Sequence, residues 1–321
     1  MIKRISILLL ALVPTMLWAQ FAPEAGVAGT TAIHADSSVF VAWATGCTIE
    51  RGPQQIDDLS LGLVSYGVDD DALGKADNMV VSLGDGGTAV LTFASPICND
   101  AGPDFAVFEN PFHTAPHCFL ELAFVEVSSD GENYFRFPAI TKVPSDEQMG
   151  SFGVMDATLI HNFAGKYEVM YGTPFDLDEV EDNPLLNKNK ITHVRLIDVI
   201  GTINPAYATY DSEGHIVNDP FPTPFYSSGF DLDAIGVLHD VAHYDVPENE
   251  TETLSVYPNP VKDRLTVKAE NLQSVEIYNL VGQLVMASTS SVIDMGDLNE
   301  GIYFVRVMAD GKTVTKRVVK Q

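Results

Sequence analysis

Basic side chains are scarce in most of this chain. Between residues 20 and 251 there are eight Lys and Arg against 36 Asp and Glu. A charge balance of this kind repels nucleic acid and anionic membrane surfaces, and it attracts cations. We therefore expect no nucleic-acid partner. The acidity alone is also typical of any extracellular protein that has to stay in solution.

Long apolar runs are absent after the first 19 residues. Lys3 and Arg4 precede an apolar run over 5–18, and the small residue Ala19 follows it. This order predicts a secretory signal peptide over 1–19. An uncleaved anchor is the alternative, but the run is short for a transmembrane helix. We therefore expect no membrane span in the mature form.

Cysteine is also rare, with only Cys47, Cys98 and Cys118 in the chain. In an oxidising compartment an odd number leaves one thiol unpaired. A Cys98–Cys118 disulfide is the first choice, because it would bracket the apolar segment 104–110. A pair that includes Cys47, or three buried thiols without a disulfide, are the alternatives.

The stretch "HTAPHC" places His113, His117 and Cys118 in one predicted loop. Imidazole and thiolate groups are ligands of zinc and copper. The spacing matches no recognised metal motif, however. A surface loop without a metal is therefore the favoured interpretation of this stretch.

Sequence signatures of common enzyme classes are missing. The chain has no nucleophile elbow, phosphate-binding loop or His-Glu-x-x-His motif. Glu109 ends an apolar segment and is a weak candidate for the raised-pKa acid of a glycoside hydrolase. Such an enzyme needs a second carboxylate, and Glu121 and Glu126 are predicted to lie on opposite faces of one strand. We therefore expect a binding protein rather than an enzyme.

Helical periodicity is nearly absent, so residues 20–246 are predicted to form one all-β domain. Apolar segments such as 88–93, 120–129 and 230–238 are separated by turns rich in Gly, Pro, Asn and Asp. This pattern favours a β-sandwich or jelly roll. Helical turns are expected only around 175–190.

Three stretches of this domain carry a family resemblance. They read "VSLGDGGTAVLTF", "AFVEVSSDGENYFRF" and "GFDLDAIGV", and they resemble the galactose-binding-like, discoidin-type jelly roll. The resemblance implies a jelly-roll β-sandwich. Blocks such as "DFAVFENPF" and "NDPFPTPF" also resemble an uncharacterised family of bacterial secreted surface proteins, which implies no established activity.

The stretch "GFDLDAIGV" raises the question of a bound cation. As a regular strand it would place Asp231 and Asp233 on one face with Ile235 and Val237. Two ionised carboxylates at this spacing repel each other unless a cation neutralises them. Calcium prefers carboxylate and carbonyl oxygens, so we expect Ca²⁺.

The jelly-roll resemblance implies a structural calcium held between an early loop and the last strand. Asp231 or Asp233 would be the last-strand ligand, and Asp70, Asp77 and Asp36 are weaker early-loop candidates. The alternative is that one aspartate caps a turn while the other is solvated.

Aromatic residues gather in two segments, 204–214 and 218–229, that are too rich in Gly and Pro to form long strands. Exposed aromatic rings stack on sugars and other flat ligands. A slightly favoured alternative is that the rings close one end of the sandwich. The predicted ligand-binding residues are Tyr207, Tyr210, Phe221, Phe225 and Tyr226.

The last part of the chain differs from the rest. Residues 247–253 read as an exposed acidic linker. Residues 254–321 balance basic against acidic side chains and alternate polar with apolar residues between short turns, which predicts a small all-β unit. The motifs Tyr257-Pro258-Asn259-Pro260 and Gly301-Ile302-Tyr303, with a basic finish over 316–320, resemble the C-terminal sorting domain of the type IX secretion system.

The sorting-domain resemblance implies a small immunoglobulin-like β-sandwich that engages the type IX secretion machinery. It implies export across the outer membrane of a Bacteroidetes-type bacterium, with a final location that is secreted or on the cell surface. The domain is usually removed on arrival, and the cargo is often attached to lipopolysaccharide. An ordinary immunoglobulin-like accessory domain is the alternative.

The leading functional hypothesis is non-enzymatic binding of an extracellular glycan or small ligand by a calcium-stabilised sandwich. One alternative is a hydrolase that acts on polysaccharide, with Glu109 among its carboxylates. Another is a structural or nutrient-capture partner of an outer-membrane receptor, with corrinoid capture as one version. A convergent carboxylate pair would favour the hydrolase, and an aromatic platform would favour glycan binding.

Overall fold

The computed structural model describes residues 21–244, 254–269, 271–279, 282–310 and 312–321. The expected signal peptide (1–19) and linker (247–253) lie outside the described residues. The chain divides into two compact units, Met1–Val241 and Ala242–Gln321. Within the described ranges, no helix is both long enough and apolar enough to span a bilayer.

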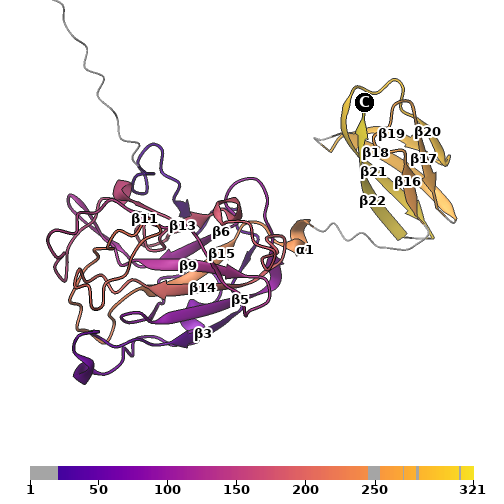
Figure 1. The fold of residues 1–321 in the computed structure, drawn as a ribbon. Coiled ribbons are helices and arrows are strands. Elements are labelled where there is room, and N and C mark those ends of the chain that lie inside the picture. Colours follow the sequence, from indigo (N-terminus) through magenta and orange to yellow (C-terminus); the bar gives the residue numbers. More distant parts are fainter. Residues whose placement is uncertain (1–20, 245–253, 270, 280–281, 311) are drawn as a thin grey trace, which may run out of the picture. The chain divides into compact units, whose positions relative to one another are not determined.

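The N-terminal unit is an antiparallel β-sandwich (Figure 1), as predicted. One sheet has the strand order β1-β13-β6-β15-β2, and β4 also pairs with β15. The strands of this first sheet are β1 (Ile33–His34), β2 (Ala42–Trp43), β4 (Val81–Ser82), β6 (Phe105–Glu109), β13 (Tyr171–Phe175) and β15 (Asp231–Val237).

The second sheet has the order β10-β9-β14-β5-β3. Its strands are β3 (Gly46–Glu50), β5 (Thr88–Ile97), β9 (Ala123–Ser128), β10 (Phe135–Arg136) and β14 (Ile191–Asp198). Two small pairs lie outside these sheets, β7 (Phe112–Thr114) with β8 (His117–Phe119) and β11 (Ile140–Thr141) with β12 (Ile160–His161).

Helical structure is limited to short turns in the described part of the chain. One of them falls in the region around 175–190 where a turn was expected. The turns are η1 (Leu59–Leu61), η2 (Asp69–Ala72), η3 (Ala157–Leu159), η4 (Leu177–Glu179) and α1 (Val241–Tyr244).

The core of the N-terminal unit lies between the two sheets. Alternate residues of each strand point inward, so Leu91, Val125 and Leu196 of the second sheet join Phe105 and Leu232 of the first in one buried cluster. Full burial of such a side chain stabilises the fold by roughly 1.5–3 kcal/mol. This packing fixes the ends of β6 and β15, where the candidate site lies.

A β-bulge interrupts the alternation of β15. Leu232 stands opposite Glu109, whereas Ala234 stands opposite Phe108, one residue further along β6. Asp233 is therefore an extra residue in β15, with no partner of its own in β6.

The bulge overturns the predicted faces of this strand. Ile235 and Val237 join Leu232 in the core between the sheets, and they do not share a face with Asp231. The prediction was wrong because a single inserted residue exchanges the two faces of a strand beyond it.

The preferred disulfide was also wrong. No disulfide joins the three cysteines. Cys118 lies in β8 opposite His113, and the backbone amide of Cys98 instead donates to the carbonyl of His239. The two residues therefore belong to different parts of the fold.

The C-terminal unit is a smaller β-sandwich, as predicted. A three-stranded sheet and a four-stranded sheet share a core that includes Leu265, Ile277 and Val305. The strands are β16 (Ser255–Tyr257), β17 (Arg264–Lys268) and β20 (Val292–Asp294) in the first sheet, and β18 (Leu272–Asn279), β19 (Leu284–Ser288), β21 (Gly301–Ala309) and β22 (Lys312–Lys320) in the second.

Candidate functional site

A small pocket of about 210 Å³ opens in the N-terminal unit, where β6 ends and β15 begins. We call it the acid pocket because Glu121 and Asp231 are part of its wall. Three segments that are distant in the sequence supply its lining: Asn110, Phe112, Phe119 and Glu121, then Ser151 and Phe152, then Thr223, Phe225, Ser227, Ser228 and Asp231.

Strand pairing brings two of the carboxylates together. Leu232 pairs with Glu109, so Asp231, the first residue of β15, lies beside the end of β6. Pro111 follows shortly after and cannot donate to a ladder, which helps to end β6 here. Glu121 arrives from the segment that leads into β9 of the opposite sheet.

These three carboxylates are deeply buried. The exposed fraction is 2% for Glu109 and 8% for both Glu121 and Asp231. Nothing in the sequence pairs Glu121 with Glu109, because 11 residues and a hairpin separate them. Only the packing of one sheet on the other brings these side chains near each other.

The three carboxylates have few hydrogen-bond partners. Asp231 accepts a hydrogen bond from the Ser82 hydroxyl and a long one, 3.5 Å, from Asn110 Nδ2. Glu109 Oε2 has no partner. Among the described residues, no side-chain hydrogen bond or ion pair involves the Glu121 carboxylate. Burying carboxylates in this way costs several kcal/mol unless they are neutralised.

Burial shifts the proton affinity of the whole group. It raises the pKa of Glu109 and of Glu121 well above the usual range, and the nearby Asp231 charge raises both further. Burial also raises the pKa of Asp231 to about 6, although the hydrogen bonds from Ser82 and Asn110 oppose the shift. The surroundings therefore favour the protonated form of Glu109 and Glu121, whereas Asp231 is largely ionised at neutral pH.

Other buried aspartates nearby are held by backbone amides. Asp198 accepts from Phe230 N at 2.7 Å and Gly86 N at 2.9 Å, and Asp219 accepts from Leu122 N at 2.8 Å. Such bonds fix loops against the sandwich and give these carboxylates a structural role. Asp231 differs, because its hydrogen bonds come from the side chains of Ser82 and Asn110.

Gly229 illustrates how tightly these loops approach. Its φ is +71°, and a Cβ at this position would lie 2.7 Å from Asp198 Oδ1. A larger residue would clash there and would be strained in the left-handed region. The glycine that opens "GFDLDAIGV" is thus explained by the entry of the chain into β15.

The predicted calcium ligands fall at separate places. Asp233 accepts hydrogen bonds from the amides of Asp77 and Asn78, both at 3.1 Å, so the early loop and the last strand do meet at Asp233. Asp231 instead faces the acid pocket, and Asp70 is exposed on η2. Asp36, the remaining candidate, pairs with Lys75 at 2.5 Å. Calcium binding stays a prediction.

Aromatic rings form the rim of the acid pocket. Phe112 and Phe119 stack with ring centroids 5.0 Å apart, Phe119 and Phe152 are 6.3 Å apart, and Phe152 and Phe225 are 5.9 Å apart. The Phe152 side chain is 70% exposed. Of these four, sequence reasoning identified only Phe225. A phenylalanine isolated in a polar segment, as in "GSFG", was the available signal for Phe152.

The remaining predicted aromatics do not gather at this pocket. Tyr226 is exposed, and its ring centroid lies 6.0 Å from that of Tyr66, whereas Phe221 is buried. Tyr207 and Tyr210 are exposed in the segment 204–214, outside the pocket lining. The five residues therefore do not line one shared pocket.

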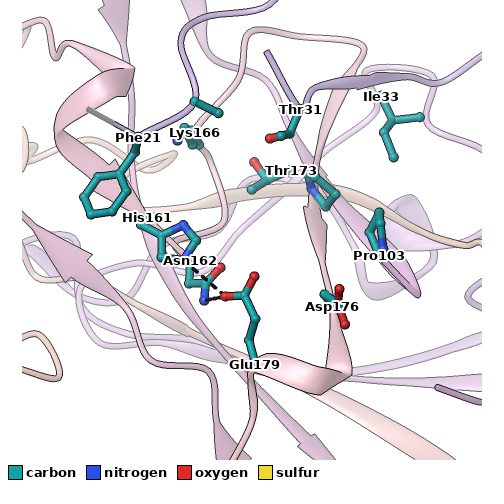
Figure 2. A pocket seen from close by; sticks show the side chains of 12 residues that line it. Phe21, Thr31, Ile33, Pro103, His161, Asn162, Lys166, Thr173, Asp176 and Glu179 are labelled. Carbon is teal, nitrogen blue, oxygen red and sulfur yellow. Dashed lines mark hydrogen bonds and ion pairs between the residues drawn. The ribbon is translucent and has the colours of Figure 1, made fainter. Parts of the chain in front are cut away.

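A second, larger cavity of about 540 Å³ lies in the same unit (Figure 2). Phe21, His161 and Lys166 are among its lining residues. Its polar groups are partnered: Glu179 pairs with His161 at 3.1 Å and accepts from Asn162 Nδ2 at 2.5 Å. Lys166 Nζ donates to the carbonyl of Ile160 at 2.8 Å, and burial lowers its pKa to about 8.

Comparison with protein families concerns the C-terminal unit. Residues 255–321 match the family described as "Secretion system C-terminal sorting domain". The match confirms the sorting domain predicted from the sequence and implies contact with the type IX secretion machinery. The protein is therefore secreted and belongs to the cell surface.

One characterised relative is beta-agarase D of Zobellia galactanivorans. It is 31% identical over 81 residues, which cover 24% of this chain and 17% of the agarase. The match thus spans less than a fifth of the length of that enzyme.

Two solved structures show a distant likeness. The Ruminococcus gnavus beta-glucuronidase has 12% sequence identity and a TM-score of 0.19, and the match covers 88% of this chain and 44% of the enzyme. The BSP domain of a biofilm-associated protein has 11% identity and a TM-score of 0.17, with 87% and 52% covered. These scores are too low to assign a shared fold.

Proposed function

We propose that the acid pocket binds the terminal unit of an extracellular glycan. One observation carries this proposal: buried carboxyl groups with unused hydrogen-bonding capacity face a pocket rimmed by phenylalanine rings. Sugar hydroxyls donate to carboxylates and accept from protonated carboxyl groups, while the apolar face of a sugar ring stacks on aromatic side chains. The location of the protein at the cell surface agrees with an extracellular ligand.

The size of the pocket favours a chain end. Pockets for drug-sized ligands occupy roughly 300–1,000 Å³, and the acid pocket has about 210 Å³. A single sugar ring suits this volume better than several linked units. The open side at Phe152 and Phe225 would leave room for the rest of the glycan to extend into solvent.

Binding is tested with the full chain against a panel of oligosaccharides, measured by calorimetry. We expect Phe152→Ala to weaken binding by about 1 kcal/mol, roughly a fivefold loss, because one stacking surface is removed. Glu121→Gln should weaken it further. Phe21→Ala, in the larger cavity, is the matched control and should leave affinity unchanged. A loss in Phe21→Ala alone would move the ligand site to the larger cavity.

A glycoside hydrolase is the second candidate function. It is favoured by the contrast between Asp231, whose pKa is about 6, and Glu121, whose pKa is well above the usual range. Glycosidases need one ionised and one protonated carboxyl group. Release of reducing sugar by the wild type, lost in both Asp231→Asn and Glu121→Gln, would favour hydrolysis. Binding without release would favour a lectin-like role.

Calcium stabilisation of the N-terminal unit is a separate proposal. Asp233 and Asp77 support it, because the last strand and the early loop meet there and the Asp77 charge lies near Asp233. Carboxylate oxygens with free lone pairs are suitable calcium ligands.

A further inference from the structure

We propose that Glu24, His113 and Cys118 form a binding site for a divalent transition metal, with Zn²⁺ as the best match. The three residues line a cavity of about 370 Å³ in the N-terminal unit. This cavity is distinct from the acid pocket, with which it shares no lining residue. The metal site does not depend on the glycan proposal.

The hairpin β7–β8 explains why two of the ligands meet. His113 stands directly opposite Cys118 in this pair, so both side chains leave the same face of the hairpin. His113 Nδ1 lies 3.6 Å from Cys118 Sγ. Ligand atoms of a tetrahedral zinc site lie about 3.5 Å apart, given bond lengths of about 2.0–2.3 Å. The pair is thus already spaced for a shared metal.

Glu24 completes the group from the segment that precedes β1. One ligand atom from each of Glu24, His113 and Cys118 lies within 4.8 Å of the others. Within the ranges that the structure describes, no other three His, Cys, Asp or Glu side chains come this close. The sequence could not show this, because Glu24 is almost 90 residues away from the hairpin.

A further histidine orients the carboxylate. His117 Nδ1 lies 3.0 Å from Glu24 Oε1. A hydrogen bond from a second residue to a ligating group is a common feature of metal sites, because it fixes the direction of the ligand. The predicted loop of His113, His117 and Cys118 therefore contributes two ligands and one positioning residue.

The mix of ligand atoms selects the class of metal. A thiolate, an imidazole and a carboxylate suit zinc, whereas calcium and magnesium prefer oxygen ligands alone. The cavity wall also contains Lys166 and Glu168. A water molecule in the cavity would supply the fourth ligand.

An alternative role for Cys118 is that of a reactive thiol, but its surroundings do not suit this role. Its side chain is buried, and the carboxylates of Glu24 and Glu168 line the same cavity. A thiol in this environment is a poor nucleophile at neutral pH. Coordination to a metal cation would instead offset the charges around it.

The site has a structural consequence for the acid pocket. Phe112 and Phe119 are opposite each other in the same hairpin, and successive residues of a strand point to opposite faces. One face of β7–β8 thus carries two rings of the pocket rim, and the other carries two metal ligands. A bound metal would hold the hairpin, and with it the rim, in place.

The test uses the purified full chain, stripped of metal and titrated with Zn²⁺ or Co²⁺ alone. We expect one equivalent to bind, with the thiolate-to-cobalt charge-transfer band in the Co²⁺ spectrum. Cys118→Ser should abolish that band, and Cys47→Ser is the matched control that should retain it. A Co²⁺ spectrum without a thiolate band, or the same band in Cys118→Ser, would overturn the proposal.

Two further variants keep the test decisive if Cys118→Ser does not fold. Glu24→Gln leaves the hairpin intact and should lower Zn²⁺ affinity at least about tenfold, and His117→Ala should lower it by about 10–100-fold through loss of the positioning hydrogen bond. Unchanged affinity in Glu24→Gln would contradict the assigned ligand set. Zn²⁺ should also raise the melting temperature of the wild type with no glycan present, which separates this result from the proposed function.

Discussion

The acid pocket and the larger cavity of the N-terminal unit differ in how their carboxylates are hydrogen-bonded. In the larger cavity, Glu179 is bound by His161 and Asn162 (Figure 2). In the acid pocket, no side-chain partner of Glu121 occurs in the described part of the chain, and Oε2 of the neighbouring Glu109 has no partner either. Volume alone would favour the larger cavity as the functional site, at about 540 against 210 Å³. The lack of hydrogen-bond partners for its buried carboxylates favours the acid pocket instead.

The pKa shifts follow the same division. The hydrogen bond from His161 lowers the pKa of Glu179, whereas burial raises the pKa of Glu121. A partnered carboxylate adds to the stability of the fold, and an unpartnered buried one opposes it. Selection for stability alone would not retain the acid pocket, which is why a ligand is the better explanation.

The largest expected effect concerns the pH dependence of folding. The pKa of Asp231 is about 6 in the folded chain and about 3.9 in an unfolded one. The folded chain therefore binds the Asp231 proton more tightly than the unfolded chain does. The stability that this proton contributes is fully present below about pH 4 and is lost as the pH rises to about 6. Between pH 4 and pH 7 the free energy of unfolding of the wild type should therefore fall by a contribution on the order of 3 kcal/mol that is missing in Asp231→Asn. Urea unfolding at the two pH values measures this difference.

Glu179→Gln is the control from the larger cavity, and its effect should have the opposite sign. The pKa of Glu179 is lowered, so its contribution to stability is present at neutral pH and disappears on acidification. The variant should be less stable than wild type at pH 7 and equal to it in strong acid. If both variants change the pH dependence in the same direction, the contrast between the two cavities is wrong.

Calcium provides a second, slightly smaller effect. At a concentration of about 100 times its dissociation constant, a ligand that binds only the folded state adds about 2.7 kcal/mol of stability. We expect the melting temperature to rise with Ca²⁺, to fall with chelator, and to be insensitive to Ca²⁺ in Asp233→Asn. Loss of the response in Asp231→Asn would place the cation in the acid pocket, where it would neutralise the carboxylates.

The smallest expected effect comes from replacing Glu109, whose Oε2 has no hydrogen-bond partner. Glu109→Gln should raise the stability at pH 8 by about 1 kcal/mol, because the amide carries no charge at any pH and can donate to the nearby Asp231 carboxylate. Glu126→Gln is the matched control: Glu126 accepts from Arg136 Nε at 2.9 Å and Arg195 Nε at 2.7 Å, so this variant should be less stable than wild type. Chemical denaturation measures both, and a destabilised Glu109→Gln would mean that the buried Glu109 carboxyl stabilises the fold.

The sequence predicted what is encoded locally. Alternating apolar residues and turn motifs were enough for the two β-sandwiches, and Tyr257-Pro258-Asn259-Pro260 with Gly301-Ile302-Tyr303 was enough for the sorting domain. These signals depend on neighbouring residues in the chain, so folding does not obscure them. Glu109 was identified for the same reason, since it ends a clear strand.

The sequence did not predict what depends on sheet packing or on local irregularity. Glu121 meets Asp231 because one sheet packs on the other, and Glu24 meets Cys118 because a loop folds back over a hairpin. Neither contact has a spacing that could be recognised in the chain. The bulge at Asp233 is a different case. The prediction assumed that side chains alternate regularly between the two faces of this strand, and the additional residue breaks that alternation.

The additional residue, Asp233, determines which side chains of β15 face the core and which face away from it. On one side of the bulge β15 presents Asp231 to the acid pocket, and on the other it presents Ile235 and Val237 to the core. Deleting Asp233 would restore an unbroken ladder with β6 and leave the other side chains on their present faces, whereas a regular ladder that kept Asp233 would exchange inside and outside beyond it. The irregularity is what allows a single short strand to serve both a polar pocket and an apolar core.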